Sequence, residues 1–186
     1  MNKREKGFSL IELLIVVAII LIIAAIAIPN LIRAKIAANQ SSAAASLRTL
    51  GSAAAMYQTT YSDGYPGANG LLIMASPVAP ATPDCTKAGL IDQNLANGLK
   101  SGYAFVWVPG ATAVPAASVP AGCAAGFTDM FSATATPTSF TTGTVSYCVD
   151  GSNVIRQNPN TGLAAPVAIV PVAATGCPTT DNPIGN

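Results

Sequence analysis

The sequence contains no histidine and few charged or aromatic side chains. Its 186 residues include nine lysines and arginines, eight aspartates and glutamates, and 6% aromatic residues. Histidine is the commonest general base and metal ligand in proteins, so its absence removes the usual starting point for hydrolytic or metal chemistry. The sequence also offers no nucleophile beside a base and no phosphate-binding loop. We therefore expect no enzyme activity, no cofactor and no metal site.

The low charge also limits the partners that the chain can bind. Charged residues make up 9% of the sequence and the net charge is +1, whereas an ordinary soluble domain carries about 25% charged residues. Such a chain has no basic surface for neutralising phosphates, so nucleic-acid binding is not expected. Hydrophobic residues make up 51%, which indicates a membrane segment in addition to the core of one modest domain.

The apolar excess is concentrated near the N-terminus. Every residue from Leu13 to Ile28 is apolar, and residues 8–28 approach the ~20 residues that a helix needs to cross a bilayer. Lys3, Arg4 and Lys6 precede this stretch. Because basic residues beside a membrane span stay cytoplasmic, we expect the N-terminus inside the cell and the remainder of the chain exported.

An ordinary secretory signal peptide is the main alternative for this segment. Such a peptide ends in a small-x-small cleavage site, whereas Pro29, Asn30 and Arg33 follow here, in a pattern that continues as a helix. Glu12 lies inside the apolar run, where a carboxylate costs about 2.5–3.5 kcal/mol at the bilayer centre and less near the interface. The span itself contains no lysine or arginine, so a partner cation for Glu12 must come from elsewhere.

The segment KGFSLIELLIVVAIILIIAAIAIPN resembles the class III signal of type IV prepilins, in which a glycine precedes a phenylalanine and a glutamate occupies the fifth position after the cut. The resemblance implies that a prepilin peptidase removes the cytoplasmic leader 1–7 by cutting between Gly7 and Phe8, and then N-methylates Phe8. It also implies that Glu12 pairs with the amino terminus of a neighbouring subunit, which supplies the missing cation. A carboxylate at headgroup level without a partner is the alternative for Glu12.

Pro29 follows the apolar run, and an amphipathic pattern continues after it. Proline lacks a backbone N–H and clashes with the preceding turn, so we expect a kink near Pro29, where members of the family melt locally during assembly. Termination of the helix at the membrane exit is the alternative. Beyond Pro29, apolar residues recur at helical spacing, which predicts a helix over residues 8–61 with a second half packed on a globular head. The stripe consists of Ile36, Ala43, Leu47, Leu50, Ala54, Tyr57 and Tyr61.

Residues 62–186 are predicted to form the head. Turn-forming residues cluster immediately after the helix, and residues 64–88 predict little regular structure beyond one packed turn over Leu71 to Met74. Residues 88–96 have helical apolar spacing and precede Asn97-Gly98, a plausible helix cap, which predicts a short helix.

Strands follow this short helix. Four segments are rich in aromatic and β-branched residues and are separated by turns, which predicts an antiparallel sheet of three or four strands. They are residues 103–108, 130–136, 144–149 and 154–156. Residues 110–122 and the tail after Asn158 are predicted to be surface loops. The expected fold class is α+β, with a long N-terminal helix kinked near Pro29 and packed on a small antiparallel sheet, the lollipop arrangement of pilins.

Four cysteines follow the apolar span, in the part of the chain expected in an oxidising compartment. They are Cys85, Cys123, Cys148 and Cys177. Two disulfides are expected, and the residues alone leave three connectivities open. The resemblance to pilins, whose C-terminal loops are often joined to the last long strand, favours Cys148–Cys177 and leaves Cys85–Cys123.

Two further groups of residues have both a functional and a structural interpretation. The run from Asp150 to Asn153 carries oxygens that suit calcium, but a turn between two strands accounts for it equally well and is preferred. Tyr103, Phe105 and Trp107 alternate along a predicted strand, so they share one face. They could form a ligand platform, but we expect them in the core.

The prepilin resemblance implies a structural function. The expected product is a homo-oligomeric, helical type IV pilus-like filament, held together by the N-terminal helix of residues 8–28. The expected partners are prepilin peptidase and a pilus or secretion assembly platform in the inner membrane. Before assembly the chain is expected as a single-pass protein of the inner (cytoplasmic) membrane with its head exported, and afterwards in the extracellular pilus.

Other uses of the same N-terminus stay open. Major pilins, minor pilins for adhesion or DNA uptake, and pseudopilins of type II secretion systems share it. The stretch YSDGYPGANGLLIMASP resembles the region after the helix in major pseudopilins, but the D-P-W-G-like segment that follows there is absent. We therefore prefer a pilus subunit, with a pseudopilin or minor pilin as the alternative. A membrane-tethered enzyme or receptor is disfavoured by the lack of a catalytic constellation.

Overall fold

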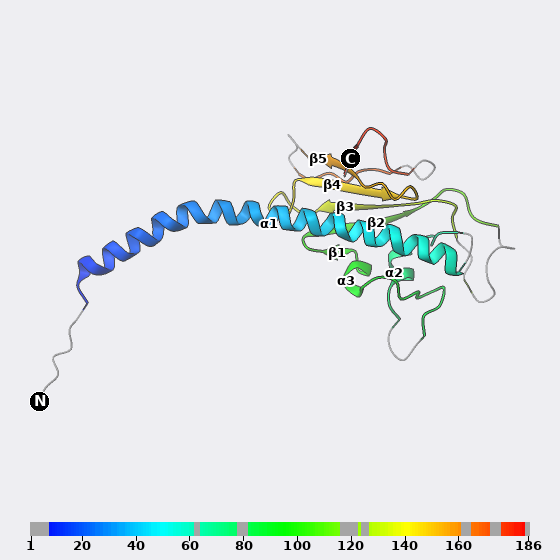
Figure 1. Cartoon of the computed structure of the whole chain (residues 1–186), viewed down its shortest axis with the longest axis horizontal. Coiled ribbons are helices and arrows are strands. Elements are labelled where there is room, and N and C mark those ends of the chain that lie inside the picture. The colour runs from blue at the N-terminus through cyan, green and yellow to red at the C-terminus, as the bar shows by residue number, and fades with distance from the viewer. Residues whose placement is uncertain are drawn as a thin grey trace, which may run out of the picture. The chain divides into compact units, whose positions relative to one another are not determined.

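The computed structural model describes residues 8–61, 64–77, 82–115, 123, 127–160, 165–171 and 176–184. The chain divides into two compact units, Met1–Lys35 and Ile36–Asn186. The long helix α1, Leu10–Tyr61, begins in the first unit and ends in the second (Figure 1). The second unit therefore begins within the helix, and the predicted start of the head after residue 61 stays a prediction.

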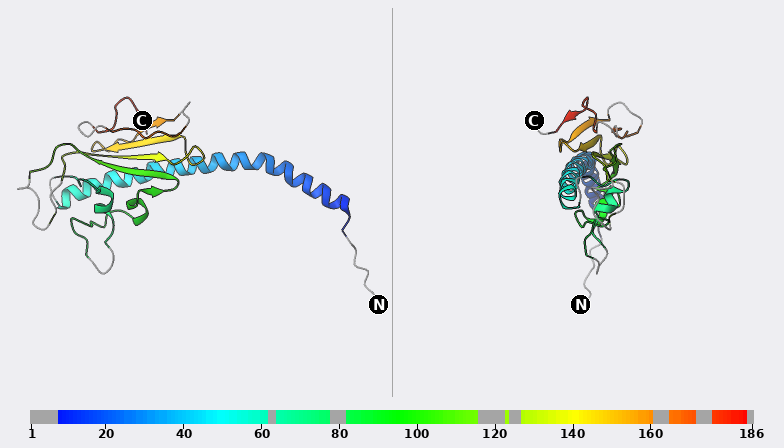
Figure 2. Two further views of the ribbon diagram at one scale, coloured as in Figure 1. Left: turned by 180° about the vertical axis from the view of Figure 1, so that it is seen from behind. Right: turned by 90° about the vertical axis from the view of Figure 1, so that its right-hand side faces the viewer.

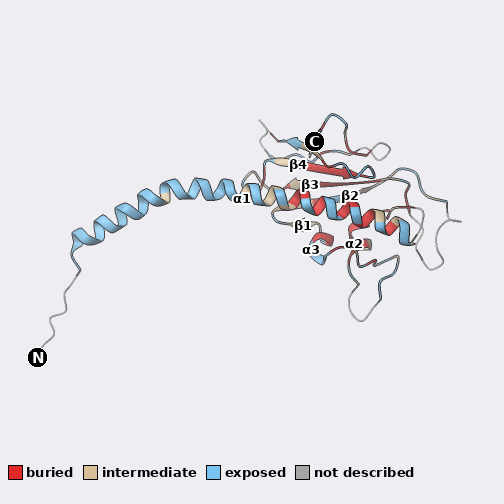
Figure 3. Ribbon diagram, viewed as in Figure 1, coloured by how far each residue is buried: buried red, intermediate tan, exposed pale blue. Residues whose placement is uncertain are grey.

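Helix α1 continues through Pro29 without interruption. The alternative that the helix ends at this proline is therefore wrong, whereas the kink stays a prediction. In the first unit, the part of α1 before Lys35 is long and apolar enough to cross a membrane. Its side chains are almost all exposed (Figure 3).

In the second unit, α1 packs on one face of an antiparallel sheet (Figures 1 and 2). The helix face that it buries is made of small and apolar residues. They are Ala43, Ala44, Ser46, Leu47, Leu50, Gly51, Ala53, Ala54 and Tyr57. The predicted stripe is confirmed from Ala43 to Tyr57, and its end members Ile36 and Tyr61 are half-buried. The predicted α+β class, a long N-terminal helix on an antiparallel sheet, is confirmed.

The sheet has six strands, whose order in space follows their order in the chain. The strands are β1 (Leu99–Lys100), β2 (Tyr103–Pro109), β3 (Phe131–Pro137), β4 (Val145–Asp150), β5 (Arg156–Pro159) and β6 (Asn182–Pro183). The prediction of three or four strands was too low, because β1 and β6 have two residues each and are too short to show a pattern. The last predicted strand was placed too early, since Val154 and Ile155 lie before β5.

Two short helices precede the sheet. Helix α2, Gly70–Met74, replaces the predicted packed turn, and α3, Gln93–Ala96, is shorter than the predicted helix over residues 88–96. Asp92 explains the late start of α3, since its side chain accepts a hydrogen bond from the Leu95 N–H as an N-cap. The predicted end at Asn97-Gly98 is confirmed, with Gly98 at φ +75°.

The core between α1 and the sheet is built on aromatic side chains. Tyr103, Phe105 and Trp107 are buried on one face of β2, as expected. Trp107 stacks on Phe131 with ring centroids 4.7 Å apart, and its Nε1–H donates to the Pro66 carbonyl at 3.0 Å. This bond satisfies the one polar atom of a buried indole.

Candidate assembly site

The predicted cleavage position lies at the start of the described chain. Phe8 precedes α1 and is 79% exposed, while Gly7 and the leader 1–7 lie outside the described residues. The residue expected to become the new N-terminus is therefore accessible, just before the start of α1.

Glu12 lies in the first turn of α1 and folds back on the helix start. Its Oε2 accepts a hydrogen bond from the Ser9 backbone N–H at 3.0 Å. Ser9 and Glu12 have the S-x-x-E spacing of a capping box, in which the glutamate satisfies an N–H that the helix leaves free. The carboxylate also lies at the positive end of the helix dipole. This contact was not predicted from the sequence, although the spacing of the two residues indicates it.

The carboxylate of Glu12 has no cationic side chain near it among the described residues of its own unit. The lysine and arginine of residues 8–35 are Arg33 and Lys35, more than 20 positions further on and therefore about 30 Å away along the helix. A full positive charge for Glu12 must come from outside these residues.

The first unit exposes a continuous apolar surface. Fifteen large hydrophobic side chains from Phe8 to Ile28, and the two that follow Pro29, are exposed by at least 46%. A soluble monomer rarely exposes an apolar patch of more than a few hundred Å². This surface therefore requires lipid or other apolar helices around it.

Pro29 lies inside this exposed helix. Because proline has no N–H, the carbonyl of Ala25, four residues earlier, receives no helical hydrogen bond from it. The helix is thus locally weaker here than in the apolar run before it.

The described cysteines form two disulfides in the second unit. Cys85 is bonded to Cys123 and Cys148 to Cys177, the two pairs that the pilin resemblance favours. Cys148 lies in β4, and both Cys148 and Cys177 are buried in a small cluster with Ile169. The second disulfide thus joins the C-terminal segment to a central strand.

A tyrosine of α1 binds the backbone of a cysteine in the first disulfide. The Tyr57 hydroxyl donates to the Cys85 carbonyl at 2.6 Å. The pKa of Tyr57 is raised to about 12, mainly by burial and to a smaller extent by the negative charges of Tyr61 and Asp84. The side-chain and backbone hydrogen bonds from Thr86 hold the pKa of the Asp84 carboxyl below its usual value. The helix and the loop around Cys85 are therefore joined by a neutral phenol.

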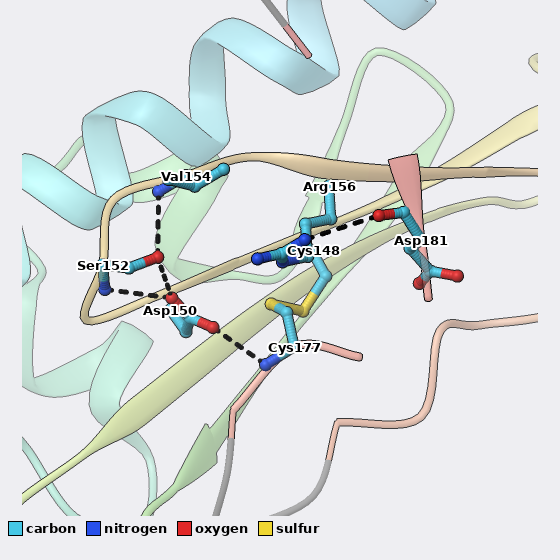
Figure 4. Close-up of a disulfide and its surroundings, with 7 residues drawn as sticks. All are labelled: Cys148, Asp150, Ser152, Val154, Arg156, Cys177 and Asp181. Carbon is cyan, nitrogen blue, oxygen red and sulfur yellow. Dashed lines mark hydrogen bonds between the residues drawn. A yellow bond between two sulfur atoms is a disulfide. The ribbon is translucent and has the colours of Figure 1, made fainter. Parts of the chain in front are cut away.

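The run from Asp150 to Asn153 forms a turn between β4 and β5, as preferred. Asp150 Oδ1 accepts from both the backbone N–H and the hydroxyl of Ser152, at 2.9 and 2.6 Å (Figure 4). Asn153 has φ +58°, a value that asparagine tolerates better than most residues. Over the ranges that the structure describes, no three acidic, cysteine or histidine side chains are grouped to hold a metal ion.

The second oxygen of Asp150 has a different partner. Asp150 Oδ2 accepts from the Cys177 backbone N–H at 3.0 Å, beside the Cys148–Cys177 disulfide (Figure 4). This contact was not predicted, because a separation of 27 residues in a segment without periodicity gives no signal for it in the sequence.

The comparisons with known proteins concern the N-terminal part of the chain. A profile of the family described as "Prokaryotic N-terminal methylation motif" matches residues 2–28. The "Type IV major pilin protein PilA" of Myxococcus xanthus is 57% identical over 49 residues, which are 26% of this chain and 22% of that protein. The "Type IV wide pilus major component PilA4" of Thermus thermophilus is 50% identical over 56 residues, 30% of this chain and 43% of that protein.

The matched segments therefore cover less than half the length of either relative. No solved structure matches the chain at the significance required of a relative. The methylation motif, the two pilin relatives and the helix on an antiparallel sheet nevertheless agree with one another. The N-terminal part of the chain is therefore similar to that of type IV pilins, and its long helix on an antiparallel sheet is a pilin-like arrangement.

Proposed function

We propose that the chain is a structural subunit of a type IV pilus-like filament, and not an enzyme. A prepilin peptidase cuts it between Gly7 and Phe8 and methylates the new amino terminus. The processed subunit is held in the inner membrane by residues 8–28 with its head exported. An assembly platform then moves it into an extracellular helical homopolymer. The observation that carries this proposal is the exposed apolar surface at the start of α1, most of which lies within the region that the methylation motif matches.

The apolar surface accounts for both locations of the subunit. In the membrane, lipid covers the exposed leucine, isoleucine and valine side chains of the first unit. In the filament, the same side chains pack against the helices of neighbouring subunits, and close packing replaces the lipid contacts. A missing hydrogen bond at Pro29 lowers the cost of unwinding α1 locally during this transfer.

Glu12 provides the specificity of each subunit addition. Before assembly its carboxylate accepts the Ser9 N–H of its own chain, which lowers the cost of holding a charge at the membrane. During assembly the methylated amine of Phe8 of a neighbouring subunit supplies a full positive charge. Methylation leaves this amine cationic, and a charge pair in a dry interface is strengthened by the low dielectric.

The substitution Glu12→Ala tests this mechanism in the native host. Removing one partner of a buried charge pair costs about 3–5 kcal/mol, which lowers the equilibrium constant of each addition by about 100-fold or more. Cleavage and methylation should continue while the yield of sheared filaments collapses. Glu5→Ala is the matched control, because it removes a carboxylate from the part that the peptidase is expected to discard. A normal filament yield from the Glu12→Ala variant would contradict the role of this residue.

Intact mass and N-terminal sequencing of the protein in sheared surface filaments test the function itself. A chain that begins at methylated Phe8 and is abundant in the shear fraction supports a pilus subunit. A processed chain confined to the membrane fraction would instead favour a pseudopilin or a minor pilin. An uncut chain beginning at Met1 would refute processing after Gly7.

A further inference from the structure

Asp150 is shared between two segments that are distant in the sequence. Its Oδ1 binds the backbone and hydroxyl of Ser152 in the turn after β4, and its Oδ2 binds the backbone N–H of Cys177 (Figure 4). The residue is only 9% exposed, and Cys177 is 3% exposed. Three charge-assisted hydrogen bonds to one buried carboxylate hold both segments more firmly than neutral bonds would.

The backbone next to Cys177 is shaped to approach this carboxylate. Gly176 has φ +76°, a conformation that glycine adopts without strain. A Cβ at Gly176 would lie 2.7 Å from Asp150 Oδ2, so any side chain there would push the carboxylate away. The close approach therefore depends on a glycine in front of the cysteine.

The turn that Asp150 holds is packed on α1. A Cβ added to Gly51 of α1 would collide with the Asn153 side-chain oxygen. Asp150 itself is the last residue of β4, two positions after Cys148. The carboxylate is thus placed by a central strand and by a turn docked on the helix, independently of the C-terminal segment.

We propose that Asp150 is a positioning residue for the Cys148–Cys177 disulfide. Its Oδ2 binds the Cys177 N–H when the cysteines are still thiols, and so holds the Cys177 side chain beside Cys148. Closure transfers two electrons and two protons from the two thiols to an external disulfide oxidant, which leaves as two thiols. The two events are thermodynamically linked: the hydrogen bond between Asp150 and the Cys177 N–H favours formation of the disulfide, and the disulfide favours the hydrogen bond to the same extent.

The test measures how readily each disulfide forms in the full chain. Protein in detergent micelles is equilibrated with reduced and oxidised glutathione, quenched with acid, alkylated and digested with trypsin. Cleavage after Lys87, Lys100 and Arg156 places Cys85 and Cys177 in different peptides, so each disulfide has its own readout. The Cys85–Cys123 disulfide serves as an internal reference within the same molecule.

Asp150→Asn is the main variant, since it keeps the shape and the Oδ1 acceptor but turns an N–H₂ group toward the Cys177 N–H. The equilibrium constant for Cys148–Cys177 should fall about tenfold or more, the usual effect of losing a hydrogen bond to a charged group. The constant for Cys85–Cys123 should change by less than about twofold. No change in Cys148–Cys177, or an equal fall in both disulfides, would overturn the proposal.

Asp84→Asn is the matched control. Asp84 also binds a residue two positions ahead through both its N–H and its hydroxyl, and it directly precedes a disulfide cysteine. This variant should leave the Cys148–Cys177 constant unchanged, and a fall equal to that of Asp150→Asn would overturn the proposal. Gly176→Ala, which keeps the carboxylate but displaces it, should lower the same constant selectively, and an unchanged constant would also refute the mechanism.

Discussion

Gly70→Ala would test whether the packing around the only tryptophan limits the stability of the head. A Cβ at Gly70 would lie 2.6 Å from Cδ1 of Trp107, and closer still to Cε2 and Nε1. The indole cannot move aside easily, because it stacks on Phe131 and its Nε1–H is bound to the Pro66 carbonyl. A single methyl group is therefore expected to displace the ring.

The size of the effect follows from three contributions. Overpacking a core typically costs about 1–3 kcal/mol, and loss of the indole hydrogen bond adds about 1 kcal/mol. Alanine is a better helix former than glycine by about 1 kcal/mol, and Gly70 is the first residue of α2. The expected net loss in the free energy of unfolding is about 1–3 kcal/mol.

Urea unfolding of the full chain in detergent micelles, followed by the fluorescence of Trp107, measures this loss directly. The chain contains one tryptophan, so the signal reports the site of the substitution. Gly151→Ala is the matched control, since its Cβ would meet its nearest neighbour, the Tyr65 hydroxyl, at an ordinary 3.6 Å. A Gly70→Ala variant no less stable than this control would refute the packing argument.

Two further predictions concern the contacts between α1 and the first disulfide. Replacing Cys85 and Cys123 with serine opens a loop with a sequence separation of 38, and should lower the free energy of unfolding by about 4 kcal/mol; a loss below about 1 kcal/mol in urea unfolding would contradict this. The pKa of Tyr57 is about 12 against an ordinary 10.0, so the folded state holds the phenolic proton more tightly. Its contribution to stability is complete below pH 10 and falls as the pH rises toward about 12. Tyr57→Phe should reduce this alkaline fall in the urea midpoint, and an unchanged fall would contradict the assignment.

The parts of the fold that the sequence predicted are those with a long regular pattern. The stripe from Ala43 to Tyr57 repeats over several helical turns, and the central strands β2 to β4 combine aromatic or β-branched residues with flanking turns. Each of these patterns indicates that one face of the element is buried, and in the structure that face is buried in the core. Strands β1 and β6 contain two residues each and are defined by pairing with a neighbour, which no local pattern encodes.

For the candidate sites too, the residues could be predicted from the sequence, whereas their contacts depend on the three-dimensional structure. Glu12 stood out because a carboxylate is rare in an apolar run, but its bond to Ser9 required the geometry of the helix start. The turn at Asp150 was predictable from its residue types, whereas the contact with Cys177 depends on how the C-terminal segment crosses the sheet. Helix α3 starts late because the Asp92 side chain accepts a hydrogen bond from the Leu95 backbone N–H, and the apolar spacing in the sequence cannot indicate this bond.

The order of the strands has a consequence for how the head forms. Each strand pairs with the one that precedes it in the chain, from β1 to β6. A chain that emerges with its N-terminal end first can therefore build the sheet by adding each new strand to the edge that the previous one leaves, on a helix that is already in place. No strand has to be inserted between two others, and the pairings β1–β2, β3–β4 and β4–β5 form quickly because the loops that they close are short. The order in which the strands emerge thus coincides with the order in which they pair, and a partly emerged head offers the edge of its latest strand to the next one, without a gap inside the sheet.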